Sequence, residues 1–206
     1  NTTPANLMNQ RADSLAAIDQ DTKYLFQEYH DGLLLYEISN REVWDKASKD
    51  EEGLKAFFKK NKKKYKWDSP RFKGIAYYAK DNKDIDAVKK SLKGVSFEKW
   101  AEVLRSTFNS DSVLKIRVEK GLFKKGDNVL VDKYEFDVDT IPAEKKDYPY
   151  CATYGKMLKA PKEMSDVRSQ VTSDYQDAME KKWLQGLRKK FPVVVNKDVV
   201  ATVNKH

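Results

Sequence analysis

Residues 50–71 read DEEGLKAFFKKNKKKYKWDSPR and mark a change from one kind of structure to another. Asp50 or Ser48 can cap a helix here, and acidic residues begin the stretch while lysines crowd its end, the charge order that a helix dipole favours. Pro70 restricts the residue before it to extended backbone, so the helix should stop before Pro70. The buried face of this helix is predicted to consist of Leu54, Phe57, Phe58 and Tyr65.

The sequence after Pro70 predicts a compact α+β unit. Residues 71–80, RFKGIAYYAK, have the aromatic and branched content of a strand and no clear alternation, which indicates burial on both faces. Alternation of apolar and charged residues predicts further strands around residues 114–119 and 134–138, the first ended by Gly121. The remaining expected elements are helices over 84–92 and 97–108, a turn over 124–128 and a last strand over 148–159.

The sequence before residue 50 predicts helices. Apolar residues recur at three- and four-residue steps from Asp13 to Glu37, with charges on the other face. Gly32 interrupts this pattern and costs about 1 kcal/mol relative to Ala, so we expect a break or kink there. Ser39 or Asn40 is then expected to cap a new helix.

A long amphipathic stripe returns from Met164 to Phe191, and Pro192 closes it before a short strand or extended tail over 193–196. A helix with such a stripe is not stable alone in water, and the N-terminal helices are its most economical partners. We therefore expect an α+β unit over 70–161 inserted into a discontinuous helical domain formed by 1–69 and 162–206.

Composition indicates a folded chain and limits the classes of partner that the sequence supports. The 206 residues are 40% hydrophobic and 12% aromatic, which argues against global disorder, and the net charge is +8. No apolar run approaches the roughly 18–20 residues of a membrane span. The first residue, Asn1, indicates a processed protein or a fragment, and its surroundings do not resemble a signal peptide. Lysine dominates the basic residues without a nucleic-acid motif, so the positive charge is interpreted as solvated surface.

The sequence carries few signs of catalysis. Cys151 is the single cysteine, and no Cys/His cluster is present, so we expect neither a disulfide nor a metal site, and no cofactor. No GxSxG or P-loop motif occurs. A Ser/His/Asp triad would require His30 or His206, the only histidines, and both are interpreted as surface residues.

The order of elements resembles the parvulin-type peptidyl-prolyl isomerases, in particular the SurA-like and PpiD-like chaperones of bacterial envelopes, over about residues 50–200. The helix EEGLKAFFKKNKKKYKW leads into the strand PRFKGIAYYAK, as in that family. The resemblance continues with Phe97 to Ala101, the loop KGLFKKGDN, the segment KYEF and the pair Tyr154-Gly155. It implies a parvulin-like unit carried by a SurA-like helical chaperone domain, closest to the long isomerases of Bacteroides-type bacteria.

The resemblance also implies that this unit is degenerate. Active parvulins carry two histidines in the pocket that holds the substrate proline, and the matching positions here are Gly74 and Met157. No catalytic residue is therefore assigned. The apolar wall of the pocket is expected to survive in residues that would equally suit a core: Tyr77, Phe123, Phe136, Tyr154 and Met157.

By resemblance we expect a periplasmic folding chaperone of the cell envelope. Its partners would be unfolded or proline-containing polypeptides, with outer-membrane proteins as one class of client. Two alternatives stay open: an active prolyl isomerase that uses tyrosine and backbone groups, and a structural module in which the long C-terminal helix pairs with its copy. The sequence does not decide the oligomeric state.

Overall fold

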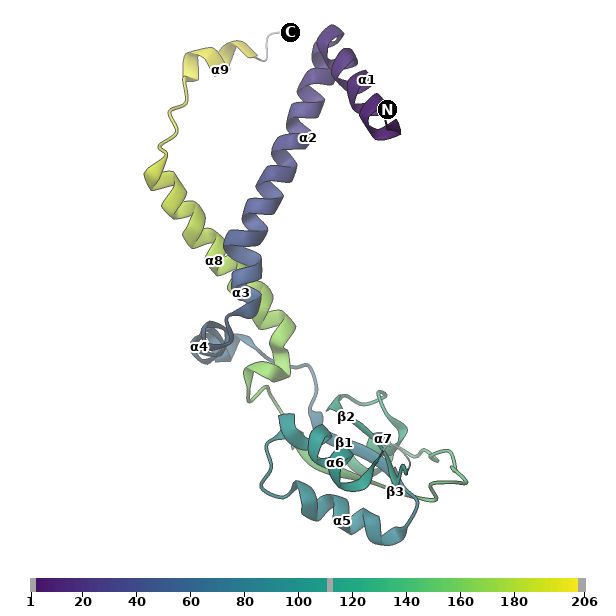
Figure 1. Cartoon of the computed structure of the whole chain (residues 1–206). Coiled ribbons are helices and arrows are strands. Elements are labelled where there is room, and N and C mark those ends of the chain that lie inside the picture. The colour runs from purple at the N-terminus through teal and green to yellow at the C-terminus, as the bar shows by residue number, and fades with distance from the viewer. Residues whose placement is uncertain (1–2, 111–112, 204–206) are drawn as a thin grey trace. The chain divides into compact units, whose positions relative to one another are not determined.

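The computed structural model describes residues 3–110 and 113–203 and shows an α+β chain (Figure 1). The chain forms two compact units. Residues 1–60 and 168–206 make up the first, here called the helical unit, and residues 61–167 make up the second, here called the sheet unit. Within the described ranges, no helix is both long enough and apolar enough to cross a membrane.

The sheet unit is built on three antiparallel strands with β1 in the centre. The strands are β1 Arg71–Ala79, β2 Ile116–Phe123 and β3 Tyr150–Leu158, in the order β2-β1-β3. Nearly every residue of β1 is buried, as expected for a strand with a neighbour on each side and a covered surface on each face. The strand predictions for residues 71–80 and 148–159 are confirmed.

Helices cover both faces of this sheet. On one face Ile75, Tyr77 and Ala79 form a core with α5 (Asn82–Leu92) and α6 (Trp100–Phe108), which follows a short 3₁₀ turn over Phe97–Lys99. On the other face Phe72 and Ala76 pack with Phe123 and with α7 (Val129–Glu135). The two helices predicted over 84–92 and 97–108 are confirmed.

The helical unit begins with α1 (Pro4–Ile18) and α2 (Gln20–Ser39). Asp19 separates them by capping α2, its carboxylate accepting from the N–H groups of Asp21 and Thr22. A π-helical turn over Asn40–Trp44 then continues directly into α3 (Asp45–Lys49).

Three more helices complete the helical unit. Asp50 caps α4 (Glu51–Asn61) by accepting from the N–H of Gly53 at 2.9 Å, as the sequence predicts. The first half of α8 (Arg168–Lys190) packs on α3 and α4, with Val171 fully buried. Tyr175 reaches α4 through its ring contact with Phe57, and α9 (Lys197–Val203) follows after an extended segment.

One predicted strand is a helix. Residues 134–138 alternate between apolar and charged side chains, yet Tyr134 lies in the last turn of α7 and Phe136 just beyond it. The Asn128 side chain accepts from the N–H groups of Leu130 and Val131, which starts the helix and turns both residues into the core. Local capping and burial of Leu130 and Val131 therefore override the two-residue period.

Three boundaries also differ from the prediction. Gly121 does not end β2, because it pairs with Gly74 inside the sheet and the strand continues to Phe123. Gly32 does not break α2, and Asn40 keeps helical backbone instead of capping a new helix. By contrast, residues 193–196 form the extended segment that was one of the two predicted options, and α4 ends at Asn61, before Pro70 as predicted.

The division between the units falls at residues 60/61 and 167/168, whereas the sequence predicts it at 69/70 and 161/162. The difference has a physical reason at the second boundary. Lys73 of β1 forms ion pairs with Glu163 and Asp166, which ties the segment after β3 to the sheet. At the first, Lys62 donates to the carbonyl of Lys162.

Candidate functional site

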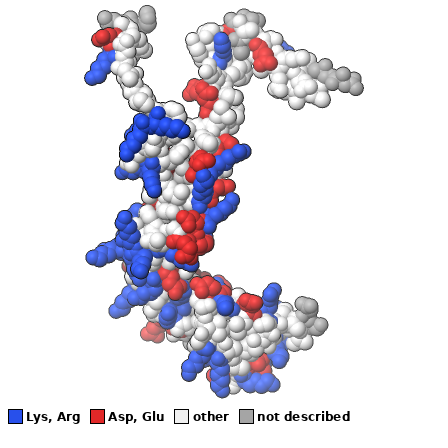
Figure 2. Space-filling view, turned by 60° about the vertical axis from the view of Figure 1, so that its left-hand side comes forward, with Lys and Arg blue, Asp and Glu red and all other residues white. Residues whose placement is uncertain are grey.

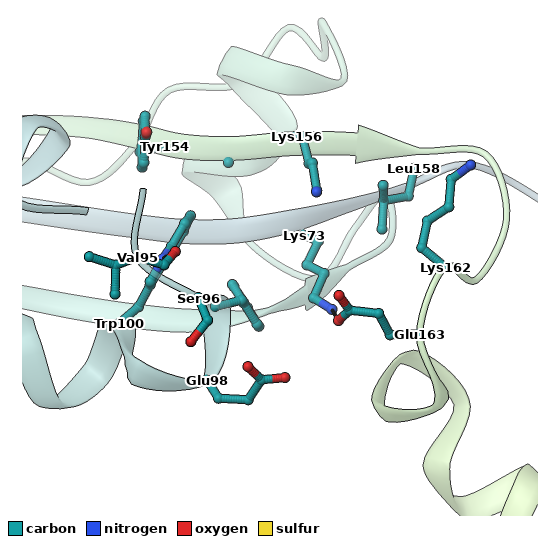
Figure 3. A pocket seen from close by; sticks show the side chains of 12 residues that line it. Lys73, Val95, Ser96, Glu98, Trp100, Tyr154, Lys156, Leu158, Lys162 and Glu163 are labelled. Carbon is teal, nitrogen blue, oxygen red and sulfur yellow. Dashed lines mark hydrogen bonds and ion pairs between the residues drawn. The ribbon is translucent and has the colours of Figure 1, made fainter. Parts of the chain in front are cut away.

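A cavity of about 350 Å³ lies on the face of the sheet that α5 and α6 cover. Its walls come from β1, β3, the segment that enters α6 and the segment that follows β3. Figure 3 shows an aromatic end at Trp100 and Tyr154 and a charged end at Lys73 and Glu163. The lining residues are Lys73, Val95, Ser96, Phe97, Glu98, Trp100, Tyr154, Gly155, Lys156, Leu158, Lys162 and Glu163.

The aromatic end is a cluster of three rings. The Trp100 and Tyr154 rings lie 5.4 Å apart at 28°, and Phe97 meets Trp100 edge-on at 5.1 Å. The Trp100 indole N–H donates to the carbonyl of Val95 at 2.9 Å, so the ring is fixed and its polar atom is satisfied. This end therefore offers a rigid apolar wall.

The charged end is built around a buried ammonium group. The Lys73 side chain is 7% exposed, and its Nζ lies 2.5 Å from Asp166 Oδ1 and 2.8 Å from Glu163 Oε2. Asp166 is 1% exposed, and its second oxygen accepts from the N–H groups of Lys162 and Glu163. These bonds hold the segment after β3 at the edge of the cavity.

The ionisation of this pair is fixed by its hydrogen bonds. Burial tends to raise the pKa of Asp166, but hydrogen bonds from Lys73 and from two backbone N–H groups outweigh it and hold the pKa below its ordinary value. Burial likewise tends to lower the pKa of Lys73, and its bonds to Asp166 and Glu163 reverse this, so the pKa is raised. Both groups are charged at neutral pH and act as a structural clamp.

Two lysines of the sheet contact the Phe97 ring at the aromatic end of the cavity. Lys73 and Lys120 place their ammonium groups 5.0 and 4.6 Å from the centroid of the Phe97 ring. Lys120 also donates to the carbonyls of Phe97 and Glu98. The exposed residues at the mouth, Lys156 and Lys162, complete an arrangement with an apolar interior and a charged rim.

On the opposite face of the sheet, aromatic rings fill the space over three glycines. Gly121, Gly74 and Gly155 are aligned across the three strands and are here called the glycine row. The rings of Phe72 and Phe123 lie over this row. A Cβ added to Gly74 would lie 2.6 Å from Phe72 Cε1 and 2.5 Å from the carbonyl oxygen of Tyr154. Gly74 therefore has no room for a side chain of any size.

The structure divides the predicted peptide-binding residues between the two faces. Tyr77 is fully buried beneath α5, and its hydroxyl donates to the carbonyl of Ile85 at 2.8 Å. Burial raises the pKa of this hydroxyl. Tyr154 alone among the five lines the cavity.

The other three predicted residues belong to the face of the glycine row. Phe123 is buried over Gly121, and Phe136 is half-buried against the same core. Met157 lies opposite Phe72 in the β1–β3 register and is 39% exposed. The five residues therefore do not form one pocket wall.

Sequence reasoning missed the residue that organises the cavity. Lys73 interrupts an otherwise buried strand, and a lysine at such a position needs an acidic partner, so its presence was a usable signal. Its partner Asp166 lies 93 residues later, in a segment that the sequence places in the helical domain, and no local pattern joins the two.

His30 does not line the cavity. His30 is exposed on α2 with its Nδ1 3.2 Å from Asp31 Oδ1, and His206 lies outside the described residues. In the part of the chain that the structure covers, no group of three or more His, Cys, Asp or Glu side chains is arranged to hold a metal ion.

Comparison with known proteins gives no relative: no protein-family model, no curated protein and no solved structure matches this chain.

Proposed function

We propose that the chain is a folding chaperone that binds unfolded polypeptide, and that its sheet unit captures peptide segments without isomerising them. The observation that carries this proposal is the cavity of about 350 Å³ with a rigid aromatic end and a charged rim. Sites for apolar ligands are typically concave, largely apolar and supplied with a few polar groups. The resemblance to parvulin-type isomerases supports the same function through the order β-α-α-β and the closing strand.

The cavity suits a large apolar side chain carried by an extended peptide. Burial against Phe97, Trp100 and Tyr154 would contribute about 1.5–3 kcal/mol for one such side chain. β3 is an edge strand that pairs with β1 within the described sheet, so its outer edge can accept the backbone of a client. Tyr154 and Leu158 on β3 would then set where the client side chain enters.

The glycine row argues for capture instead of catalysis. Prolyl isomerisation crosses a torsional barrier of about 18–20 kcal/mol, which a catalyst lowers with an apolar site and directed hydrogen bonds. The position that the resemblance assigns to the first pocket histidine is Gly74, and the space around it is filled by Phe72. We infer that the polar network of an active isomerase is missing from this unit.

The proposal extends to place and partners by resemblance. The chain would act in the cell envelope of a bacterium, in the periplasm, on unfolded or proline-containing polypeptides that include outer-membrane proteins. The positive net charge of +8 would assist encounter with acidic clients, an effect that salt weakens.

Fluorescence of Trp100 tests this site directly. The variant Trp44→Phe/Trp67→Phe/Trp183→Phe leaves Trp100 as the only tryptophan. We expect titration with an unstructured peptide rich in Phe and Pro to shift its emission, with a Kd on the order of 100 μM, about −5 kcal/mol. The same peptide with Ser in place of Phe should give no shift.

A filled cavity provides the matched control. Ser96 lines the cavity and Ser106 lies exposed on α6 away from it, so Ser96→Phe should abolish the shift while Ser106→Phe should leave it unchanged. Equal binding by both variants would remove the cavity from the proposal. A failure of the full chain to delay aggregation of any unfolded protein would remove the chaperone function itself.

A protease-coupled assay addresses isomerisation. The expected rate with a proline tetrapeptide is the uncatalysed rate, even at high protein concentration. A faster rate that Phe72→Ala alters would restore the enzyme alternative and place it at the glycine row.

A further inference from the structure

The surface of α2 carries nine exposed large apolar side chains. Its large apolar side chains lie on all sides of the helix and are each 43–69% exposed. A helix that is apolar all round is normally buried. These residues are Tyr24, Leu25, Phe26, Tyr29, Leu33, Leu34, Leu35, Tyr36 and Ile38.

The side of α2 that a single partner can cover has the area of a large exposed apolar patch. Of these nine side chains, Leu25, Phe26, Tyr29, Leu33 and Tyr36 share one side of the helix and present about 100 Å² each, roughly 500 Å² in all. A standard interface buries about 800 Å² on each partner, whereas the largest patch of a typical monomer is about 300–600 Å². Gly32 adds a hollow on this surface, lined by Leu25, Tyr29 and Leu33.

The second half of α8 carries half-buried and exposed apolar side chains and the opposite charge. Met179, Trp183 and Leu187 follow at four-residue steps, with the exposed residues Leu184 and Phe191 on the same side. Within the described ranges, no hydrogen bond or ion pair joins residues 177–190 to another helix, whereas the first half of α8 is bound to Trp44, Asp50 and Glu51.

The charges of the two surfaces are complementary. Residues 19–39 contain five acidic side chains and one lysine, a formal charge of −4, in a chain whose net charge is +8. Residues 179–191 contain five basic side chains and one glutamate, a formal charge of +4. Figure 2 shows basic side chains gathered near the end of α8.

We propose that the chain forms a two-fold symmetric dimer in which α2 of one copy packs against the second half of α8 of the other. A two-fold axis repeats this contact, so each copy gives one acidic and one basic apolar surface. Glu28 and Glu37 border the side of α2 that carries Leu25, Phe26, Tyr29, Leu33 and Tyr36. Arg188 and Lys190 border the side of α8 that carries Met179, Trp183 and Leu187. Apolar burial supplies the affinity, and charge selects α2–α8 pairing over α2–α2 or α8–α8 pairing.

This arrangement predicts an obligate heterodimer after charge exchange. In one variant, Lys182→Glu, Arg188→Glu and Lys190→Glu make both surfaces acidic. In a second variant, Asp21→Lys, Glu28→Lys and Asp31→Lys make both surfaces basic. We expect the wild-type chain to be a dimer by light scattering and sedimentation, each variant alone to dimerise at least tenfold more weakly, and their mixture to restore dimerisation to within about threefold of wild type.

Control variants test whether the charges on α2 and α8 are themselves responsible for pairing. The exposed residues Lys90, Lys93 and Lys99 belong to the sheet unit, so changing all three to Glu should leave dimerisation unchanged. Circular dichroism of both exchange variants should retain the helical signal of wild type. The double change Tyr29→Ser/Leu33→Ser on α2 should give a monomer with a folded sheet unit, shown by amide exchange.

Three outcomes would overturn the proposal: a monomeric wild-type chain at 100 μM, unimpaired dimerisation by each exchange variant alone, or folded variants that fail to pair when mixed. In the first case an unfolded client or the chain's own α8 would be the occupant of the α2 surface. The dimer does not rest on the proposed function. The two can fail separately, because the dimer is tested by the mass of the particle and peptide binding in the cavity is tested by Trp100 fluorescence.

Discussion

The sheet unit and the helical unit contain similar fractions of apolar residues, but they differ in how far these residues are buried. In the sheet unit, α6 buries Trp100, Leu104 and Phe108 against a strand whose other face is also covered. In the helical unit, α2 has more large apolar residues and exposes nearly all of them. The difference is one of available surface: a sheet offers a flat partner to several helices, whereas a single long helix must find its partner elsewhere.

The glycine row gives the largest test of this comparison. A Cβ at Gly155 would clash with the carbonyl oxygen of Lys73 and lie 2.6 Å from Gly74 Cα. Both contacts are to backbone, so β1 and β3 must separate to admit a side chain. We expect Gly155→Val to cost more than about 4 kcal/mol and to remove amide-exchange protection from the whole sheet unit. Unchanged protection in β1 would show that the strands can shift.

The same variant distinguishes the two units. Peptides from the first half of α8 should keep their protection, because this half contains the buried Val171 and belongs to the helical unit. Loss of protection in both units at once would mean that they unfold together.

The predictable and unpredictable parts of the fold follow from where the information lies. The strand over 71–79 and the helices over 82–92 and 100–108 could be predicted, because their burial periods are local and strong. The helix at 129–135 could not, because its cap at Asn128 outweighs a misleading alternation of Tyr134 and Phe136. Tyr154 was the one cavity residue predicted. Lys73 was not predicted, because its pairing with Asp166 leaves no pattern in the local sequence.

Matched leucine truncations measure the comparison itself. Leu104 of α6 is 3% exposed and Leu34 of α2 is 56% exposed. Leu104→Ala should lower the free energy of unfolding by about 3 kcal/mol through lost burial and a residual cavity. Leu34→Ala should change it by less than about 0.5 kcal/mol at concentrations where the chain is monomeric. Urea unfolding followed by amide exchange reports on each unit; equal costs would show that α2 is buried in solution.

The buried ion pair gives the next effect. Asp166→Asn removes a charge that faces Lys73, while Glu163 remains available to it, so we expect a loss of about 2 kcal/mol in the sheet unit. Glu163→Gln is the control: its side chain is 59% exposed, and the change should cost less than about 1 kcal/mol. Urea unfolding of the full chain measures both, and a larger cost for Glu163→Gln would reverse the roles of the two acids.

The same pair gives the sheet unit a pH dependence with a definite sign. The pKa of Asp166 is lowered in the folded chain, so the carboxylate binds fewer protons when folded than when unfolded. Its contribution is complete above its ordinary pKa of about 3.9 and is lost as the pH falls through the lower folded value. Stability of the sheet unit should therefore decline below about pH 4, and Asp166→Asn should reduce that decline; an identical decline in the variant would assign it to other carboxylates.

The smallest expected effect is a gain in the helical unit. Gly186 lies inside α8, and a Cβ added there meets no atom within 4 Å, so Gly186→Ala gains helix propensity without a clash. The expected stabilisation is about 0.8–1 kcal/mol, visible as slower amide exchange in the second half of α8 at monomer concentration. Gly126 in the sheet unit is the matched control: it is equally open, but its φ of +95° disfavours any side chain, so Gly126→Ala should destabilise by about 1 kcal/mol. If Gly186→Ala also destabilises the monomer, the second half of α8 already has a partner within its own chain. The contrast between buried apolar side chains in the sheet unit and exposed ones in the helical unit would then fail at that helix.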